Sequence, residues 1–397
     1  MSLENLPFHV EIGYQQANHW ETRICGDVFL THRIKEENRI IVVLSDGLGH
    51  GVKANVLATL TATMAMSFTS EHKEFHKIAE IIMNTLPVDS ERQISYATFT
   101  IIDIEIEGET RILEYDNPQA VILRGDKIFE PEWSDILLQS EKGRGKELRS
   151  CSFKSQMEDR ILICSDGIVQ SGMGSDKYPF GWGRDNMQDY TARLVATTPD
   201  ISAARLATKV MNMTATNDGH QPKDDTTTAV MYFREPRKLL LCTGPPFDPE
   251  KDVELAGIVE KFPGKKVVCG ATSIDIIARE WKQEITDSFE FHDPDLPPIS
   301  YMPGIDLVTE GILTLGKVNE ILKKYNLTTK LGKGPADQIV KLFLESDEID
   351  FLIGTRINVA HQDPSLPVEL EIRRTAVKRI AHLLDEKFLK EVKLRFI

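Results

Sequence analysis

Cysteine is scarce in this chain, and its spacing gives no sign of a bridge or a metal site. The 397 residues include only five cysteines, and no pair has the CxxC spacing of a zinc or redox motif. We therefore expect reduced, buried thiols rather than disulfides or bound zinc, as is typical of a cytoplasmic protein. The five are Cys25, Cys151, Cys164, Cys242 and Cys269.

Long apolar runs and a basic excess are missing as well. No stretch approaches the roughly 18 apolar residues of a membrane span, and residues 1–10 lack the pattern of a secretory signal. The chain has 47 Lys and Arg against 61 Asp and Glu, a net charge of −14. Because Lys and Arg drive binding to nucleic acids and anionic membranes, this balance disfavours both as partners. An acidic enzyme acting on phosphate would need a metal ion to bring its substrate in.

What the chain does have is four aspartates, each at the end of a segment with the pattern of a strand. Asp27 follows Gly26, and Asp46 opens Asp-Gly-Leu-Gly-His-Gly. Asp166 opens Asp-Gly after an apolar run, and Asp224 opens Asp-Asp-Thr-Thr before another. One Asp-Gly pair usually marks only a turn. Four such elements together place carboxylates at strand ends, where loops on a rigid sheet carry chemistry.

Carboxylates gathered in one cleft repel each other unless a cation neutralises them. These four are too far apart in sequence for an EF-hand, and an open site of oxygen ligands suits Mg²⁺ or Mn²⁺. We expect two ions. Asp46 would bridge them and the carbonyl of Gly47 would bind one, with Asp166 and Asp224 completing a shell and Asp27 binding directly or through water.

Such a pair of ions predicts a metal-dependent phosphatase. A metal-bound hydroxide would attack phosphorus, so no side chain is needed as the nucleophile. His50 is a candidate general acid for the leaving seryl oxygen, and the alternative is a histidine at a helix start with no catalytic duty.

In order and spacing, these elements resemble the bacterial SpoIIE-like branch of the PPM metal-dependent serine/threonine phosphatases. The resemblance covers about residues 8–233, and its most specific part is the Asp-Gly-x-Gly-His-Gly element at 46–51 before a small-residue helix. It implies an αββα sandwich and two Mn²⁺ or Mg²⁺ ions bound by the four aspartates and Gly47. It also implies hydrolysis of phosphoserine or phosphothreonine on a signalling protein, in many relatives a STAS-type anti-anti-sigma factor.

Three positions extend the resemblance less firmly. Some phosphatases of the wider superfamily hold phosphate with an arginine shortly before the first aspartate, and Arg23 lies near that place; a surface charge is the alternative. Residues 172–183, rich in Gly and aromatic residues, are either a substrate flap or an irregular connection. Asp225 competes with Asp224 as the last ligand, and the family register favours Asp224.

A change of pattern near residues 234–237 predicts two domains, 1–233 and 234–397. The first has an α+β pattern of strand meanders and separate helical blocks, which favours layered antiparallel sheets flanked by helices. Its strands are expected at 8–17, 27–34, 39–46, 94–105, 110–116, 119–125, 148–156, 160–166 and 226–233. Its helices are expected at 52–67, 74–86 and 184–214, the last one broken near Pro199.

The second domain has the pattern of a smaller α/β domain. Strands are expected at 238–242, 266–269, 351–353 and 368–372, and helices near 250–262, 272–284, 316–325, 335–346 and 373–390. Pro-rich loops occupy 244–246 and 294–303. The turn at 269–273 and Gly244 suggest a pocket for a small anionic or nucleotide ligand that regulates the phosphatase, because helix N-termini bind anions. An ordinary packing turn capped by Thr272 or Ser273 is the alternative.

Other classes of function remain open or are disfavoured. A ligand sensor acting through the second domain, or a pseudophosphatase that only binds, would keep the same motifs. A dinucleotide-binding loop is disfavoured, because the glycines at 47, 49 and 51 do not fit G-x-G-x-x-G. The phosphate loop GxxxxGK[ST] is absent from the sequence.

Overall fold

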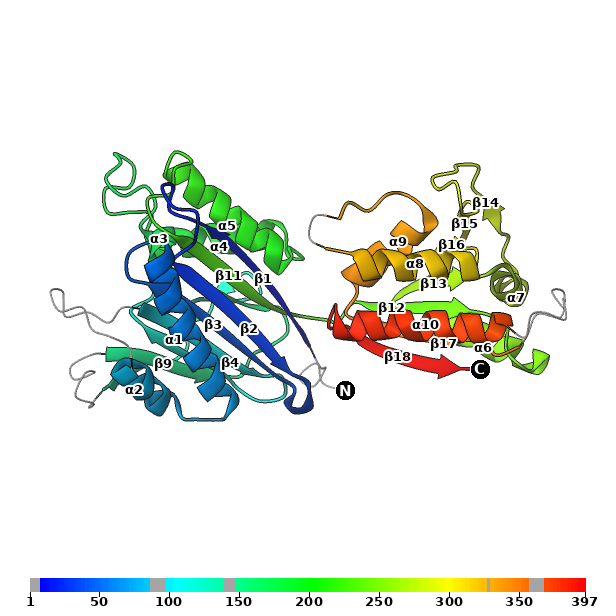
Figure 1. Ribbon diagram of the computed structural model, residues 1–397, viewed down its shortest axis with the longest axis horizontal. Coiled ribbons are helices and arrows are strands. Elements are labelled where there is room, and N and C mark those ends of the chain that lie inside the picture. Colours follow the sequence, from blue (N-terminus) through cyan, green and yellow to red (C-terminus); the bar gives the residue numbers. More distant parts are fainter. Residues whose placement is uncertain (1–7, 86–96, 139–146, 327–328, 357–367) are drawn as a thin grey trace. The chain divides into compact units, whose positions relative to one another are not determined.

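The computed structural model describes residues 8–85, 97–138, 147–326, 329–356 and 368–397. The chain divides into two compact units, residues 1–235 and 236–397 (Figure 1). We describe each unit by itself, because each has its own sheets and its own buried core.

Unit 1 contains two antiparallel sheets. The six-stranded sheet has the order β2-β3-β4-β5-β9-β8, and the five-stranded sheet has the order β1-β11-β10-β6-β7. The first comprises β2 (Asp27–Ile34), β3 (Arg39–Gly47), β4 (Ala97–Glu105), β5 (Thr110–Tyr115), β9 (Glu147–Phe153) and β8 (Ser134–Leu137). The second comprises β1 (His9–Ala17), β11 (Thr226–Arg234), β10 (Asp159–Cys164), β6 (Val121–Arg124) and β7 (Lys127–Ile128).

Helices cover the outer face of each sheet. On the six-stranded sheet lie α1 (Val52–Ser70) and α2 (Phe75–Thr85); on the five-stranded sheet lie α3 (Asp166–Val169), α4 (Arg184–Thr197) and α5 (Ala203–Asn217). Three apolar layers result: one between the sheets and one under each helical layer. This is the expected αββα sandwich, confirmed here by its layers.

Alternation along the strands decides which side chains enter which layer. In β4, Ile102 and Ile104 pack between the two sheets, whereas Phe99 and Ile101 pack under α1 and α2. Both faces of the central strands are therefore apolar. In β3 the side chain of Leu44 packs in the layer between the sheets. Asp46 lies two residues later, so its side chain projects from the same face of the strand.

Unit 2 has one seven-stranded sheet in the order β14-β15-β16-β13-β12-β17-β18. Its parallel strands are β12 (Lys238–Thr243), β13 (Lys265–Cys269), β16 (Ile305–Thr309), β17 (Glu348–Ile353) and β18 (Glu391–Phe396). The short strands β14 (Thr286–Asp287) and β15 (Ser300–Met302) add an antiparallel edge. The unit has the expected α/β character, with helices on both faces of the sheet.

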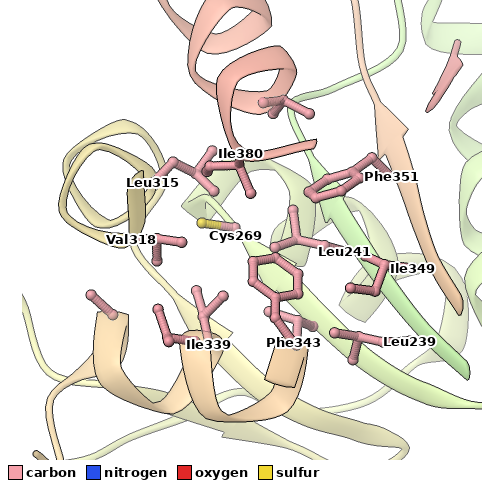
Figure 2. Close-up of a cluster of buried hydrophobic side chains, with 14 of the residues drawn as sticks. Leu239, Leu241, Cys269, Leu315, Val318, Ile339, Phe343, Ile349, Phe351 and Ile380 are labelled. Atoms are coloured by element: carbon pink, nitrogen blue, oxygen red, sulfur yellow. The ribbon is translucent and has the colours of Figure 1, made fainter. Parts of the chain in front are cut away.

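One face of this sheet carries α8 (Ile312–Lys324), α9 (Pro335–Glu345) and α10 (Val368–Glu386), and the other carries α6 (Asp252–Lys261) and α7 (Ala271–Trp281). Figure 2 shows the core under the first set: Leu241 and Phe351 of the sheet meet Phe343 of α9 and Ile380 of α10. The Cys269 side chain points into this core, so it is a packed thiol as expected.

Several expected elements differ from the structure. Residues 368–372 were predicted as a strand but begin α10, and the Pro-rich segment 294–303 contains β15. The short strands β7 and β8 and the strands β16 and β18 were not expected. Residues 94–96 of the expected strand at 94–105, and residue 86 of the helix at 74–86, lie outside the described residues. None of the described helices is both long and apolar enough to cross a membrane.

Candidate active site

Two of the four aspartates meet because of strand register. In the β2–β3 pair, Asp27 lies directly opposite Asp46. Side chains of residues directly opposite each other in an antiparallel pair project from the same face. This is the face of β3 that carries Leu44, and it faces the other sheet. Asp27 and Asp46 therefore lie at one end of the layer between the sheets.

The other two aspartates come from the five-stranded sheet. Asp166 is the first residue of α3, directly after β10, and Asp224 lies two residues before β11. Because β10 and β11 are antiparallel neighbours, the end of one lies beside the start of the other. The pairing continues past Cys164: the Ser165 backbone N–H donates to the Thr227 carbonyl over 3.0 Å.

Thr227 connects the two sheets at this point. Its hydroxyl donates to Asp27 Oδ2 over 2.7 Å, across 200 residues of sequence. The same hydroxyl accepts from Gln16 Nε2 at 3.1 Å, and the Thr227 backbone N–H donates to Ser165 Oγ at 2.9 Å. Asp27 is only 2% exposed. These bonds fix its carboxylate, and so they bring the four aspartates to one end of the sandwich.

The aspartates perturb one another's protonation. Burial raises the pKa of Asp46 well above its usual range, and the negative charges of the other three aspartates raise it further. Burial also raises the pKa of Asp27 and of Asp224 to about 6, and that of Asp166 by an amount that hydrogen bonds partly offset. Like charges in a partly dry site disfavour ionisation in this way. Among the described causes, His19 is the one basic group that opposes this effect, and it acts on Asp224.

The donor set fits a hard divalent cation. Asp27 Oδ1 and Asp166 Oδ1 are buried and accept no hydrogen bond, and such orphaned carboxylate oxygens are the ligands that Mg²⁺ and Mn²⁺ prefer. Across the described ranges, however, no three His, Cys, Asp or Glu side chains already have a metal-binding arrangement. Asp46 nevertheless lies close enough to Asp27, Asp166 and Asp224 for their charges to raise its pKa. A divalent cation among these carboxylates would relieve their repulsion.

Gly47 has a steric requirement of its own. A Cβ added there would lie 2.1 Å from the backbone oxygen of Ala54 in α1. The helix can approach β3 so closely because its buried face carries only small residues, and Ala54, Ala58 and Ala62 are fully buried. The loop 48–51 between them includes Gly49 and Gly51, both with positive φ. The small-residue helix predicted after the aspartate motif therefore holds the Asp46 strand end in place.

The two weaker candidates lie at the rim of the cluster. His50 is exposed, and its ring stacks on that of His19 with centroids 4.6 Å apart. His19 in turn donates its backbone N–H to Asp225 Oδ1 at 2.9 Å. Arg23 is exposed in the loop between β1 and β2. In the part of the chain that the structure describes, neither side chain makes a hydrogen bond or ion pair with the four aspartates.

Three further residues belong to the site but were not chosen from the sequence. Asp225 is 1% exposed, its Oδ2 has no partner, and its charge raises the pKa of Asp27. Asp116, in the turn after β5, raises the pKa of Asp166, and Gln170 donates to Asp166 Oδ2 at 2.7 Å. The Asp-Asp dipeptide was the only sequence signal among them, because a turn aspartate and a helix glutamine are commonplace.

Residues 172–183 form an anchored loop beside this cluster. Trp182 is 3% exposed and Tyr178 packs on the same core, while Lys223 Nζ donates to the Met173 carbonyl at 3.0 Å. The tip is open: Phe180 is 90% exposed. The loop is thus tied down at several points and presents an aromatic side chain to solvent.

Comparison with solved structures gives distant matches. The PP2C phosphatase domain of SpoIIE from Bacillus subtilis, with a fragment of its regulatory domain, is 16% identical, with 57% of this chain and 64% of that chain covered and a TM-score of 0.47. The RsbU and RsbW domains of Rv1364c from Mycobacterium tuberculosis are 18% identical, with 64% and 68% covered and a TM-score of 0.46. RsbX in complex with magnesium is 16% identical, with 58% and 98% covered and a TM-score of 0.41.

The chain thus spans less than two thirds of the first of these proteins. The comparison with curated proteins gives no match. The decisive comparison is with family models: the model described as Stage II sporulation protein E (SpoIIE) matches residues 36–234, half of the chain, including Asp46, Asp166 and Asp224. With the αββα sandwich and the carboxylate cluster at its end, this match shows that the chain belongs to the SpoIIE family of PPM-type phosphatases.

Proposed function

We propose that this protein is a metal-dependent protein serine/threonine phosphatase. The observation that carries the proposal is a cluster of aspartates from both sheets whose pKa values are raised by burial and by one another, with His19 near Asp224 as the one basic group that opposes this among the described causes. Family membership supports phosphatase chemistry in particular. A chain that buries uncompensated carboxylates at a loop-rich edge has a reason to do so only if a cation joins them.

In this proposal the carboxylates of Asp46, Asp27, Asp166 and Asp224 and the carbonyl of Gly47 would hold the ions. When bound, Mn²⁺ or Mg²⁺ would clamp phosphoryl oxygens and lower the pKa of a water for attack on phosphorus. Asp225 lies deeper, and we assign it the role of orienting the loop of His19 through their hydrogen bond.

The remaining side chains hold these ligands or meet the substrate. Thr227 orients Asp27, and Gln170 orients Asp166. His50 is proposed as a general acid at the rim, and Arg23 as a phosphate ligand; their exposure leaves both accessible to a substrate.

A protein substrate fits the surroundings of the cluster better than a small metabolite. Trp20 is 58% exposed, and its backbone N–H donates to the Pro222 carbonyl two residues before Asp224. Ile24 and Phe180 are also exposed on the adjoining loops. Apolar side chains around a polar site provide contact area for a polypeptide. A phosphorylated STAS-type anti-anti-sigma protein is the first candidate substrate, by family resemblance.

Hydrolysis of p-nitrophenyl phosphate and of a phosphoserine peptide tests the proposal, with EDTA, Mg²⁺ or Mn²⁺. We expect activity that requires metal and falls by about 10³-fold or more in Asp46→Asn, since the ions lose a bridging charge. Asp189→Asn, an exposed aspartate on α4, is the matched control and should match wild type.

Wild-type turnover in Asp46→Asn at matched Mn²⁺ contradicts the assignment. Absence of turnover with any metal, together with saturable Mn²⁺ binding that Asp46→Asn removes, would favour a pseudophosphatase that uses the site only for binding.

A further inference from the structure

The strand order of unit 2 identifies an edge at which ligands bind in other folds. Numbered along the chain, the parallel strands β12, β13, β16, β17 and β18 lie in the order 3-2-1-4-5. In doubly wound sheets of this kind, ligands bind outside the carboxyl ends of the strands. In unit 2 this edge is formed by the loops that begin at Gly244, Gly270, Glu310 and Gly354.

Three of the helices that begin at this edge are α6, α7 and α8, and two of these three already have a negative charge there. The first turn of α6 contains Asp252 and Glu254. The start of α8 is capped by Glu310, whose Oε2 accepts from the backbone N–H of Leu313 at 3.1 Å and of Thr314 at 3.3 Å. The partial positive charge of these helix starts is therefore satisfied by the chain itself.

The start of α7 differs from both. Its first turn has no acidic residue, and no side chain caps it. Gly270, the residue before the helix, has φ of +126°, and Ala271 is exposed, so the first turn is open to solvent. The α8 start lies alongside, because a Cβ built on Gly311 would lie 3.4 Å from Gly270 Cα.

A buried hydroxyl without a partner points to a ligand at this helix start. Ser273 is 1% exposed, and its Oγ makes no hydrogen bond. A Cβ built on Gly270 would lie 3.7 Å from this oxygen, so the hydroxyl is directed back towards the helix start. A buried hydroxyl without a partner is destabilising, because it has lost its hydrogen bonds to water. The alternative expected from the sequence was a turn capped by Thr272 or Ser273. The Ser273 side chain does not cap it, because no side chain caps the start of α7.

A positive side chain lies at the same edge. Arg373 of α10 places Nη1 2.6 Å from the position that a Cβ on Gly244 would occupy. Its charge also acts on Cys269, the residue before Gly270: burial raises the pKa of that thiol to about 12, the charge of Glu310 raises it further, and the charge of Arg373 lowers it. The guanidinium therefore adds positive potential close to the α7 start.

We propose that the start of α7, with the Ser273 hydroxyl and the nearby Arg373, binds the oxyanion group of a small metabolite. The Ser273 backbone N–H already donates to the Gly270 carbonyl at 3.1 Å. The backbone N–H groups of Ala271 and Thr272 would donate to phosphate or carboxylate oxygens, and the Ser273 hydroxyl would add a further donor. A dinucleotide is not the ligand we expect, because Cys269 and Gly270 stand where that class of fold carries a ribose-binding acid. This site is independent of the phosphatase chemistry of unit 1.

Calorimetric titration of the full chain tests the proposal with three probes: inorganic phosphate, AMP and citrate. All titrations use the Asp46→Asn background with EDTA, so that a metal-held phosphate in unit 1 does not contribute. We expect saturable binding of at least one probe at one site per chain. Phosphate alone, AMP or citrate as the tightest probe would identify the source of the oxyanion as free phosphate, a nucleotide or a carboxylate metabolite.

Two substitutions at one exposed position locate the site. Ala271→Asp places a carboxylate at the first turn of α7 and should weaken binding about tenfold or more, while a helix start tolerates or favours the new charge. Ala271→Asn has nearly the same shape without the charge and should bind within about threefold of the parent. Thermal unfolding checks that both variants are folded. Absence of saturable binding for all three probes, or equal affinity of the Asp and Asn variants, overturns the proposal.

Discussion

The two ends of strand β3 carry buried acids in opposite circumstances. At its start, Asp103 of β4 is 1% exposed, and its Oδ1 accepts from Arg39 Nε at 2.7 Å. Its Oδ2 accepts from Arg39 Nη2 at 2.9 Å and from Arg111 Nη2 at 2.6 Å. At the other end is Asp46, seven residues after Arg39 or about 23 Å along the strand, and the charges that shift its pKa are those of other carboxylates.

The comparison separates structural acids from functional ones. Asp103 has a bidentate arginine, and that arrangement is complete within the chain. The Asp46 cluster is incomplete without an external cation. A cavity of about 630 Å³ lies at the Arg39 end and is lined by Glu37, Arg39 and His72 among others. A cavity is therefore a poorer guide to chemistry here than carboxylates that lack a paired cation.

Removing the arginine should have the largest effect. Arg39→Leu leaves Asp103 buried beside the half-exposed Arg111 alone, and we expect a loss of about 3–5 kcal/mol in the free energy of unfolding. Chemical denaturation measures it. The control is Arg205→Leu, an exposed arginine on α5, which should change stability by no more than about 0.5 kcal/mol. A loss as small as that of Arg205→Leu would show that Asp103 does not depend on Arg39 for its stability in the core.

Glu114 on β5 is an intermediate case and gives a dependence on pH. It is 1% exposed, accepts from the Ala120 backbone N–H at 2.7 Å, and has Arg149 only at 3.7 Å. Burial raises its pKa to about 7, offset in part by that hydrogen bond and by Arg149. The folded state therefore holds a proton that the unfolded state releases near its ordinary pKa.

It follows that the stability from Glu114 is complete below about pH 4.5 and is lost as pH rises through about 7. Glu114→Gln keeps the Ala120 bond without the charge. Relative to wild type, the variant should gain up to about 3 kcal/mol between pH 5 and pH 8. Denaturation at both pH values measures the difference, which isolates Glu114 from the aspartates with the same trend. A difference that does not change with pH would contradict the assigned pKa.

Metal should complete the other end of β3. At 100 times its dissociation constant, Mn²⁺ should stabilise the folded protein by about 2.7 kcal/mol, because it binds only the assembled carboxylates. Thermal unfolding with and without Mn²⁺ measures the shift. Asp46→Asn should remove most of it, whereas Asp189→Asn should not. An equal shift in Asp46→Asn would place the metal elsewhere.

The smallest effect concerns His50. Because its ring stacks on His19 at the rim, His50→Phe keeps the contact and removes the proton-transfer group. If His50 acts as the general acid for a seryl leaving group, kcat on a phosphoserine peptide should fall about 10²-fold. Hydrolysis of p-nitrophenyl phosphate, whose leaving group needs no acid, should stay within about threefold. Equal, slight effects on both substrates would leave His50 only a packing role.

Most strands of unit 1 could be predicted from the sequence, because they are buried on both faces and several end at recognisable aspartates. It failed at residues 368–372, Val-Glu-Leu-Glu-Ile, whose alternation imitates a strand. The segment is helical because it continues into Val377, Ile380 and Leu384, a set with helical spacing that packs in the core. Strands β15 and β18 are short or exposed edge elements, where little apolar pattern exists to detect.

For the site, the sequence identified which aspartates end strands, and tertiary structure decided which of them meet. Register puts Asp27 opposite Asp46, and a threonine from the other sheet fixes it. Nothing local indicated Asp116, whose influence on Asp166 comes through space from a turn. The ligand roles of Asp27, Asp46, Gly47, Asp166 and Asp224 stay predictions until metal is measured.

The hydrogen bond from Thr227 to Asp27 has a consequence for how unit 1 folds during synthesis. Strand β11 lies at the end of unit 1, and it pairs with β1 at the beginning, His9 opposite Arg234. During synthesis β1 cannot pair until β11 has been made, and non-local pairings of this kind form slowly. A nascent chain that has already made Asp27, Asp46 and Asp166 therefore still lacks the strand that fixes the first of them. The aspartate cluster can therefore assemble only after the whole of unit 1 has emerged from the ribosome.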